Sequence, residues 1–250
     1  LDVARICEYH KPKVIFCENV KGLTIHDKGK TFKVICNTFE KLGYKVFSQV
    51  LNSKDFGVPQ NRERIYIVAF RDDIAPKYFK FPNPTDSTKT LIDIQEENPV
   101  PAKYYLSDTY METLIRHKER HAAKGNGFGY EIREWHGIAG AIVCGGMGRE
   151  RNLVIDKRQT DLTPTTHIKG EINKEGIRKM TPREWARLQG FPDSYKLVLA
   201  DTHLYKQFGN TVTVNVIQSI AEKIRDVLNG TWEDEPDPQY GQLSLFDCID

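Results

Sequence analysis

Helical and extended patterns alternate over the first 71 residues, and this alternation limits the folds open to the chain. Helical spacing of apolar residues covers 2–9 and 31–42, and short apolar runs typical of buried strands cover 13–17, 44–51 and 65–70. Strands that alternate with helices favour an α/β domain, in which helices cover the faces of a sheet.

The pattern changes near Asp72, where prolines and then glycines and charged residues interrupt the apolar runs. We therefore predict a first domain at 1–74 and a small, loop-rich second domain at 75–180. Residues 181–230 return to helical patterns: Thr181 and Glu184 form a capping box around a helix at 181–189, and 212–228 is a long amphipathic helix. The polar residues 231–250 are expected to form a flexible tail.

Composition excludes several classes of protein. Hydrophobic residues make up 39% and charged residues 28% of the 250 residues, which indicates a soluble globular protein, and no apolar run is long enough to span a bilayer. The five cysteines are dispersed and none has Cys-x-x-Cys spacing, so we predict reduced thiols in a cytoplasm and no metal site.

The net charge of +2 conceals an uneven distribution along the chain. Residues 112–187 are rich in Arg, Lys and His, whereas the stretch from Trp232 onward is acidic. The basic stretch can face phosphates, although charge alone favours the simpler interpretation of a solvated surface.

Two groups of polar residues adjoin the predicted strands. Glu18 and Asn19 follow the strand at 13–17, and ligands bind at such strand ends in open α/β sheets. Gln60, Arg62 and Arg64 alternate in an extended segment, so they point to one side, where two guanidinium groups suit a phosphate or a base edge. The alternatives are a structural glutamate and an edge strand protected by charge.

Two further segments border the predicted helices near the C-terminus. Thr181–Pro192 is a capped helix closed by Gly and Pro, in which Trp185 and Leu188 are expected to be buried. In Phe208–Val212, Gly209 allows a close approach and Asn210 can hold a polar ligand near the start of the last helix. An ordinary helix cap would explain the second segment equally well.

Together these segments resemble the DNA cytosine-5 methyltransferase family. Glu-Asn-Val, Gln-x-Arg-x-Arg, a variable region, Thr-Pro-Arg-Glu-x-Ala-Arg-Leu-Gln-Gly-Phe-Pro-Asp and Gly-Asn-Thr-Val occur in the family's order across nearly all of residues 1–230. The resemblance implies an α/β fold with part of an S-adenosylmethionine-dependent, Rossmann-like sheet and a small irregular target recognition domain.

The resemblance also implies a reaction, the transfer of a methyl group from S-adenosylmethionine to C5 of a cytosine flipped out of double-stranded DNA. Glu18 would bond N3 of the ring, and Arg62 and Arg64 would support the base and the carboxylates. Asn19 and Gln60 are expected at the DNA, and Asn210 and Thr211 near the cofactor.

The variable region would be the target recognition domain. Its Gly145, Gly146, Arg149 and Arg151 are the candidates for DNA contact, because glycines permit a close approach and arginines bond guanine. The alternative is a glycine-rich turn with solvated arginines. The family's Thr before this loop is replaced by Ala141-Ile142, which puts its phosphate contact in doubt.

No Phe-x-Gly-x-Gly loop and no Pro-Cys dipeptide occur in the sequence. We therefore expect the chain alone to be inactive, to bind cofactor poorly and to need a segment or companion subunit that carries the Pro-Cys motif. A fragment of a one-chain enzyme, half of a split enzyme and a non-catalytic DNA-binding relative remain open; a start inside a helix without Met favours the fragment.

The C-terminal tail contains a short motif of its own. Gln242, Leu243, Leu245 and Phe246 resemble the peptide with which bacterial proteins bind the DNA polymerase sliding clamp. An apolar patch that folds back on the domain is the alternative. We expect a bacterial or phage protein of the cytoplasm, associated with the nucleoid.

Overall fold

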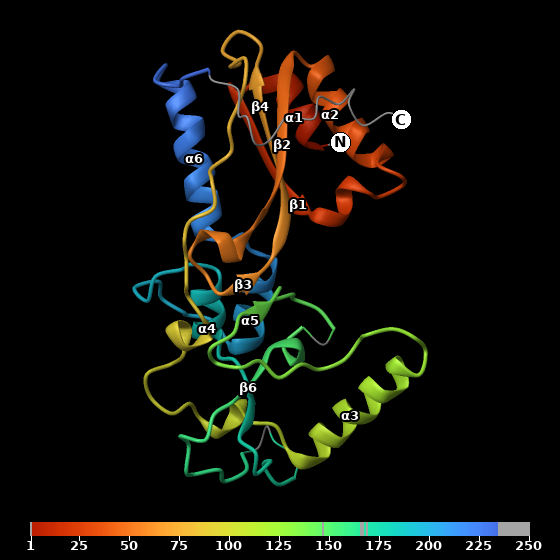
Figure 1. Ribbon diagram of the computed structural model, residues 1–250, viewed down its shortest axis with the longest axis vertical. Coiled ribbons are helices and arrows are strands. Elements are labelled where there is room, and N and C mark those ends of the chain that lie inside the picture. The colour runs from red at the N-terminus through yellow and green to blue at the C-terminus, as the bar shows by residue number, and fades with distance from the viewer. Residues whose placement is uncertain (1, 147, 166–167, 169, 235–250) are drawn as a thin grey trace. The chain divides into compact units, whose positions relative to one another are not determined.

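The computed structural model describes residues 2–146, 148–165, 168 and 170–234, and it divides into two compact units (Figure 1). Unit 1 comprises residues 1–52, 63–84 and 216–250, and unit 2 comprises 53–62 and 85–215. No helix in the described part of the chain is both long and apolar enough to cross a membrane.

A three-stranded sheet forms the centre of unit 1. Its strands are β1 (Val14–Val20), β2 (Tyr44–Asn52) and β4 (Glu63–Arg71), in the order β1-β4-β2. Because β4 is antiparallel to both neighbours, β1 and β2 run in the same direction. They are connected through α2 (Lys30–Lys41), as expected for strands that need a crossover.

Helices cover both faces of this sheet, which confirms the α/β prediction (Figure 1). On one face, Cys7 of α1 (Asp2–His10) and Phe39 of α2 pack against Ile15, Tyr44 and Ala69. Figure 1 shows α6 (Val214–Leu228) on the opposite side, where it buries Val216, Ile220 and Ile224. The spacing of these three residues matches one stripe of a helix.

The structure corrects three details predicted for unit 1. β1 extends to Val20, so Glu18 and Asn19 lie within the strand and do not follow it. β4 is the central strand, so the alternative of a charge-protected edge strand is wrong. The helical spacing of residues 31–42 predicts Val34 on one apolar face with Ile35 and Phe39, but the exposure of Val34 is 60%.

The stretch beyond α6 is anchored as far as it is described. The Trp232 ring stacks on Phe79 with a centroid distance of 5.3 Å, and its Nε1 donates to the Tyr78 carbonyl at 3.0 Å. The Asp234 carboxylate accepts hydrogen bonds from the backbone N–H groups of Lys77 and Tyr78. The expectation of a flexible tail from residue 231 therefore does not hold for these residues.

Unit 2 is built from short elements. Its helices are α3 (Asp108–Ala122), α4 (Pro182–Leu188) and α5 (Asp201–Asn210), and β3 (Gln60–Asn61) pairs in parallel with β5 (Ala139–Gly140), while β6 (Leu153–Ile155) pairs antiparallel with β7 (Ile177–Lys179). The 3-10 helices of the described chain are η1 (Lys21–Thr24), η2 (Ser53–Phe56), η3 (Leu91–Ile94), η4 (Ala102–Tyr104) and η5 (Glu150–Asn152).

The helix α4 forms as its sequence predicts. The Thr181 side chain accepts from the Glu184 N–H, and the Glu184 carboxylate accepts from the Thr181 N–H, which completes the capping box. Trp185 and Leu188 are buried, as expected, in a core shared with Tyr205 and Phe208 of α5.

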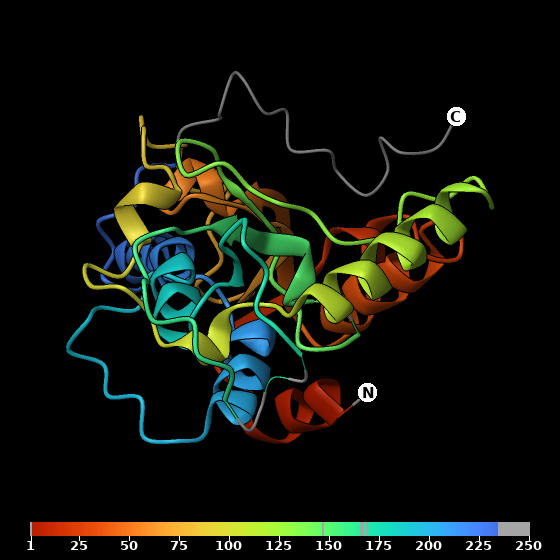
Figure 2. The same cartoon turned by 90° about the horizontal axis from the view of Figure 1, so that it is seen from below.

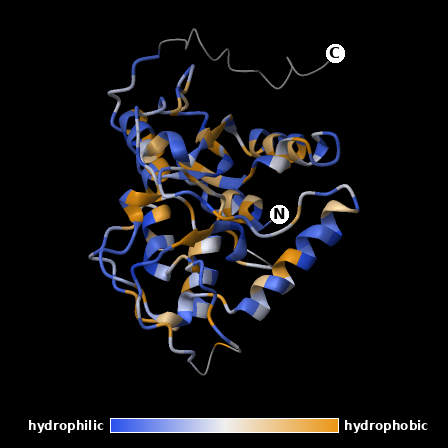
Figure 3. Cartoon of the chain, turned by 60° about the horizontal axis from the view of Figure 1, so that its bottom comes forward, coloured by the Kyte–Doolittle hydropathy of each residue, from blue (hydrophilic) through white to orange (hydrophobic). Residues whose placement is uncertain are grey.

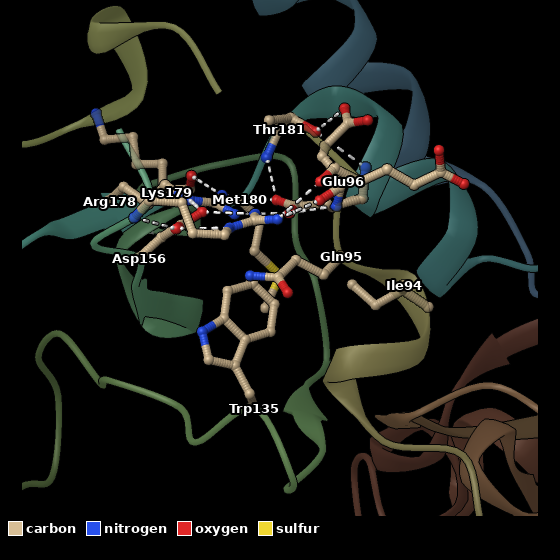
Figure 4. A network of polar contacts seen from close by, with 12 residues as sticks. Ile94, Gln95, Glu96, Trp135, Asp156, Arg178, Lys179, Met180 and Thr181 are labelled. Atoms are coloured by element: carbon tan, nitrogen blue, oxygen red, sulfur yellow. Dashed lines mark hydrogen bonds and ion pairs between the residues drawn. The ribbon is translucent and has the colours of Figure 1, made fainter. Parts of the chain in front are cut away.

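A buried network of charges fixes the start of this helix (Figure 4). Arg178 of β7 is fully buried, and its guanidinium makes two hydrogen bonds of 2.8 Å to Glu184 and one of 3.0 Å to Asp156. The Trp135 ring lies 5.5 Å from the Arg178 guanidinium. Since each buried charge has a hydrogen-bonded partner, the network avoids the cost of an isolated buried ion.

Candidate active site and recognition loop

Glu18 and Arg64 form an ion pair on one face of the unit 1 sheet. Glu18 lies opposite Tyr66 and Arg64 lies opposite Val20 in the β1–β4 register, so the two side chains are diagonal neighbours on the same face. The Arg64 Nε lies 3.1 Å from Glu18 Oε1, and the side-chain exposures are 13% and 23%. The pair is thus sheltered but open to a ligand.

Asn19 occupies the next position of β1, so it projects from the other face of the strand. Its side chain is exposed, and its Oδ1 accepts from the backbone N–H of Val20 at 2.8 Å. This bond fixes the end of the strand, and it leaves the amide N–H₂ group as the part of Asn19 that can donate to a ligand.

Gln60 and Arg62 bind the backbone N–H and the backbone carbonyl of the same residue in unit 2, Ile142. The Gln60 Oε1 accepts from the backbone N–H of Ile142 at 3.0 Å, and Arg62 Nη1 donates to the Ile142 carbonyl at 2.8 Å. Arg62 Nη2 donates to the Thr211 carbonyl at 2.9 Å. Both side chains are buried, so they fix the backbone that enters the glycine-rich loop.

This arrangement corrects the role predicted for Gln60. Its exposure is 0%, and its Nε2 is directed at the Leu188 carbonyl, at 2.8 Å, and at Gln189 Oε1. A side chain buried and bonded in this way has no face left for DNA. Arg62 and Arg64 were expected to act together, but the structure assigns them to different units, and Arg64 is paired with Glu18.

Gln189 and Thr213 extend this network and were not recognised from the sequence. Gln189 Nε2 donates to the Phe208 carbonyl, while Gln189 Oε1 accepts from Thr213 Oγ1 at 2.9 Å. Thr213 Oγ1 is also 2.8 Å from Ser53 Oγ. All three are buried, and the signal in the sequence was Gln189, a polar residue that directly follows the apolar Leu188 of α4.

The loop from Cys144 to Arg149 lies against α5. A Cβ on Gly148 would lie 2.1 Å from the Val143 carbonyl oxygen, and a Cβ on Gly209 would lie 2.5 Å from the Cys144 nitrogen. These two glycines are therefore required for packing. Gly145 and Gly146 have open space around their Cα atoms, and they are the ones free for an approaching ligand.

The two arginines predicted at DNA both rest on aromatic rings. The Arg149 guanidinium lies 5.4 Å from the Tyr205 ring, and that of Arg151 lies 5.3 Å from the Phe128 ring. A hollow of about 90 Å³ is lined by Gly145, Gly146 and Arg149 together with Thr202 and Lys206 of α5. Exposed glycines and cations thus share one surface of unit 2.

The residues predicted near the cofactor lie at the end of one helix and not at the start of the next. Asn210 is the last residue of α5 and is exposed, and Thr211 caps this helix, whereas α6 begins only at Val214. The alternative of an ordinary cap on the last helix does not hold for Asn210, because this residue ends α5, which was not recognised from the sequence. The carbonyl of Thr211 is held by Arg62.

Three of the four described cysteines have thiols whose pKa is raised by burial. Burial raises the pKa values of Cys7 and Cys17, and it raises the pKa of Cys36 to about 12, so these three remain thiols at neutral pH. Cys144 is exposed in the loop. In the described part of the chain, no three His, Cys, Asp or Glu side chains are grouped to hold a metal ion.

The predicted clamp-binding residues Gln242, Leu243, Leu245 and Phe246 lie outside the described residues.

Comparison with known proteins decides the family. Residues 1–226 match the family model of C-5 cytosine-specific DNA methylases. The chain belongs to this family. It is 60% identical to the type II methyltransferase M.HpaII of Haemophilus parainfluenzae over 93% of the chain and 65% of that protein. It is 42% identical to M.SsoII of Shigella sonnei over 91% of the chain and 57% of that protein.

These methylases are longer than the present chain, which spans a little over half to about two thirds of their length. Among solved structures, the crystal structure of S. pombe Dnmt2 methyltransferase matches with a TM-score of 0.63 at 17% identity, over 88% of this chain and 67% of that one. This likeness shows a shared fold and agrees with the predicted methyltransferase class.

Proposed function

We propose that this methylase chain supplies the base-holding residues and the recognition region of a DNA cytosine-5 methyltransferase. The observation that carries the proposal is the ion pair of Glu18 and Arg64 on neighbouring strands, at the two positions that match the family's Glu-Asn-Val and Gln-x-Arg-x-Arg motifs. The substrate is double-stranded DNA with a cytosine flipped out of the helix.

The geometry of the pair gives each residue a role. Arg64 holds Glu18 Oε1, which orients the carboxyl group, so that Oε2 in its protonated form can donate a hydrogen bond to N3 of the ring, which is an acceptor. That bond favours addition of a nucleophile at C6, because it stabilises the charge that develops on the ring. Arg62 acts at a distance, as the residue that positions Ile142 and Thr211.

S-adenosylmethionine would supply the methyl group. Asn210 is exposed and Thr211 is half-buried, so their side chains are accessible to a polar part of this cofactor. Asn210 and Thr211 fit the edge of a cofactor site. The main part of that site would be the family's glycine-rich loop, which does not occur among residues 1–250.

The nucleophile must come from outside these residues, since no cysteine among them follows a proline. We expect no methyl transfer by residues 1–250 alone, and transfer when a segment with the Gly-rich and Pro-Cys motifs is supplied, in the same chain or on a companion subunit. A non-catalytic DNA-binding relative is the alternative function.

The test measures transfer of labelled methyl groups from S-adenosylmethionine to duplex DNA by the complemented protein. Glu18→Gln should lower the rate by about 10²-fold or more, as expected for loss of a positioned acid, with DNA affinity unchanged. Glu40→Gln, at an exposed position of α2, is the matched control. DNA binding without transfer in every complemented form would instead support the binding-module alternative.

We further propose that the tail residues Gln242, Leu243, Leu245 and Phe246 bind a bacterial sliding clamp, which would place the protein on DNA in the cytoplasm. Only the sequence motif supports this. Affinity for purified clamp that is unchanged in the double variant Leu245→Ala, Phe246→Ala would exclude it.

A further inference from the structure

The Arg149 guanidinium keeps its hydrogen-bond donors for a ligand. In the described part of the chain it makes no hydrogen bond or ion pair, and its contact is the Tyr205 ring, 5.4 Å from its centre. An aromatic ring takes no conventional hydrogen bond, so all the N–H donors of this arginine remain available. Arg187 of the same unit, by contrast, spends its donors on Asp193 and on backbone carbonyls.

The carboxylate that follows Arg149 in the sequence is turned away from it. Glu150 is buried, and its Oε1 lies 3.1 Å from the Tyr110 hydroxyl, which donates to it, and 3.3 Å from the Lys179 Nζ. Glu150 also begins the 3-10 helix η5, so these contacts fix the backbone from which the Arg149 side chain departs. Arg149 therefore has a fixed base and a charge without a paired carboxylate.

The Tyr205 ring is itself fixed in the core of unit 2. It is buried, its hydroxyl donates to the Met180 carbonyl, and it lies edge to face with the Trp185 ring at a centroid distance of 4.9 Å. Figures 1 and 2 show the helices that carry these two rings, α4 and α5, side by side. The ring thus offers the Arg149 side chain an immobile surface.

Tyr205 lies where the buried side of α5 meets its exposed side. Thr202 and Lys206 are exposed, and together with Tyr205 and Arg149 they line the hollow of about 90 Å³ beside the glycine-rich loop. Figure 3 shows hydrophobic and hydrophilic residues alternating along the helices, as expected where one side of a helix is buried. A core residue at this border can orient a side chain that faces outward.

We propose that Tyr205 is a positioning residue that aligns Arg149 for hydrogen bonds to the edge of one guanine in the target site. Guanine O6 and N7 accept two parallel N–H groups from a guanidinium, and this pairing depends on how the guanidinium plane is oriented. Contact with a fixed ring restricts this long side chain before DNA arrives, so less freedom is lost on binding. The inference rests on the proposed function, since duplex DNA is the substrate assigned there.

The experiment measures sequence preference and not only rate. The complemented protein methylates a duplex library with randomised positions around a cytosine, and bisulfite sequencing gives the preference for each base. Arg149→Met should lower the preference for guanine at one position by about tenfold or more. Tyr205→Leu should lower it at the same position by about two- to fivefold, as expected for loss of a partly exposed cation–π contact. Tyr205→Phe, which keeps the ring, should retain it.

A purely structural role of Tyr205 would leave this preference unchanged. Loss of folded protein lowers the methylation of all sequences equally, as Leu204→Val should do in the same core, away from the hollow. In the Arg149→Met background, Tyr205→Leu should have no further effect on preference, because it acts through the arginine. If Tyr205→Leu does not fold, Tyr205→Phe with successive ring fluorines replaces it. Fluorine withdraws negative charge from the ring face and should lower the preference stepwise.

A wild-type preference in Tyr205→Leu, or in every member of the fluorinated series, would overturn the proposal. An unchanged preference in Arg149→Met would overturn it as well, and so would an equal effect of Tyr205→Leu with and without Arg149. A wild-type profile that favours guanine at no position has the same meaning. Absence of methylation by the wild-type complemented protein would count instead against the proposed function, which separates the two failures.

Discussion

At the scale of single residues, the glycines of the recognition loop divide into two kinds. Gly148→Ala would place a Cβ within 2.1 Å of the Val143 carbonyl oxygen, whereas Gly145→Ala would meet no atom within 4 Å. We expect the first change to destabilise unit 2 by about 1–3 kcal/mol, as overpacking does, and the second to leave stability unchanged. Urea denaturation of the two variants measures the difference. Equal unfolding midpoints for Gly148→Ala and Gly145→Ala would contradict the division of the glycines into two kinds.

The sequence predicts the local backbone structure around the site residues better than it predicts which side chains surround them. The alternation of Gln60, Arg62 and Arg64 was correctly assigned to an extended segment, and the Thr181–Glu184 cap formed as predicted. These features depend on a few neighbouring residues. The burial of Gln60 depends on Ile142 and Leu188, far away along the chain, and no local pattern contains that information.

At the scale of elements, β7 and α4 are joined by the buried charges of Arg178, Asp156 and Glu184. Burial alone would raise the pKa of Asp156, but hydrogen bonds from Arg158 and the charges of Arg178 and Arg158 outweigh it and hold this pKa at about 2. Because the folded-state pKa lies below the unfolded one, near 3.9, ionised Asp156 stabilises the fold above about pH 4. That contribution should be lost as the pH falls from about 4 toward 2.

The variant Asp156→Asn tests this link. It should be less stable than the wild type at pH 7, and the difference should shrink as the pH falls from 4 to 2, when unfolding midpoints are measured at each pH. Asp193→Asn, whose carboxylate is 63% exposed in its pair with Arg187, is the control with a small expected effect. If the stability difference between Asp156→Asn and the wild type did not depend on pH, the loss of stability would come from packing and not from the charge of Asp156.

The features that sequence reasoning missed were hidden for different physical reasons. α3 buries only Met111 and Leu114 among its 15 residues, so its apolar stripe is too sparse to stand out. α5 contains Gly209, normally a sign of a helix end, which is present because the loop at Cys144 passes close to it. The position of β4 between β1 and β2 is likewise a result of long-range pairing.

At the scale of the whole molecule, each unit is assembled from separated stretches of chain, an arrangement that composition along the sequence does not reveal. Residues 53–62 belong to unit 2, although they lie between two strands of unit 1. The boundary between unit 2 and unit 1, which lies between Arg62 and Glu63, falls inside the Gln-x-Arg-x-Arg motif. One short motif thus contributes Arg62, which holds the Ile142 and Thr211 carbonyls, to unit 2, and Arg64, which pairs with Glu18, to unit 1.

The return of the chain to unit 1 predicts a local effect on stability. Trp232→Ala removes the stack on Phe79 and the bond to the Tyr78 carbonyl, and it should cost about 2–4 kcal/mol, less than a fully buried Trp. If the units open separately, hydrogen exchange should accelerate in β2 and β4 while the amides of α4 keep their protection. Glu233→Gln, an exposed neighbour, should change neither. Equal acceleration in α4 would show instead that the two units unfold as one, and that the C-terminal stretch stabilises the recognition unit as much as the sheet.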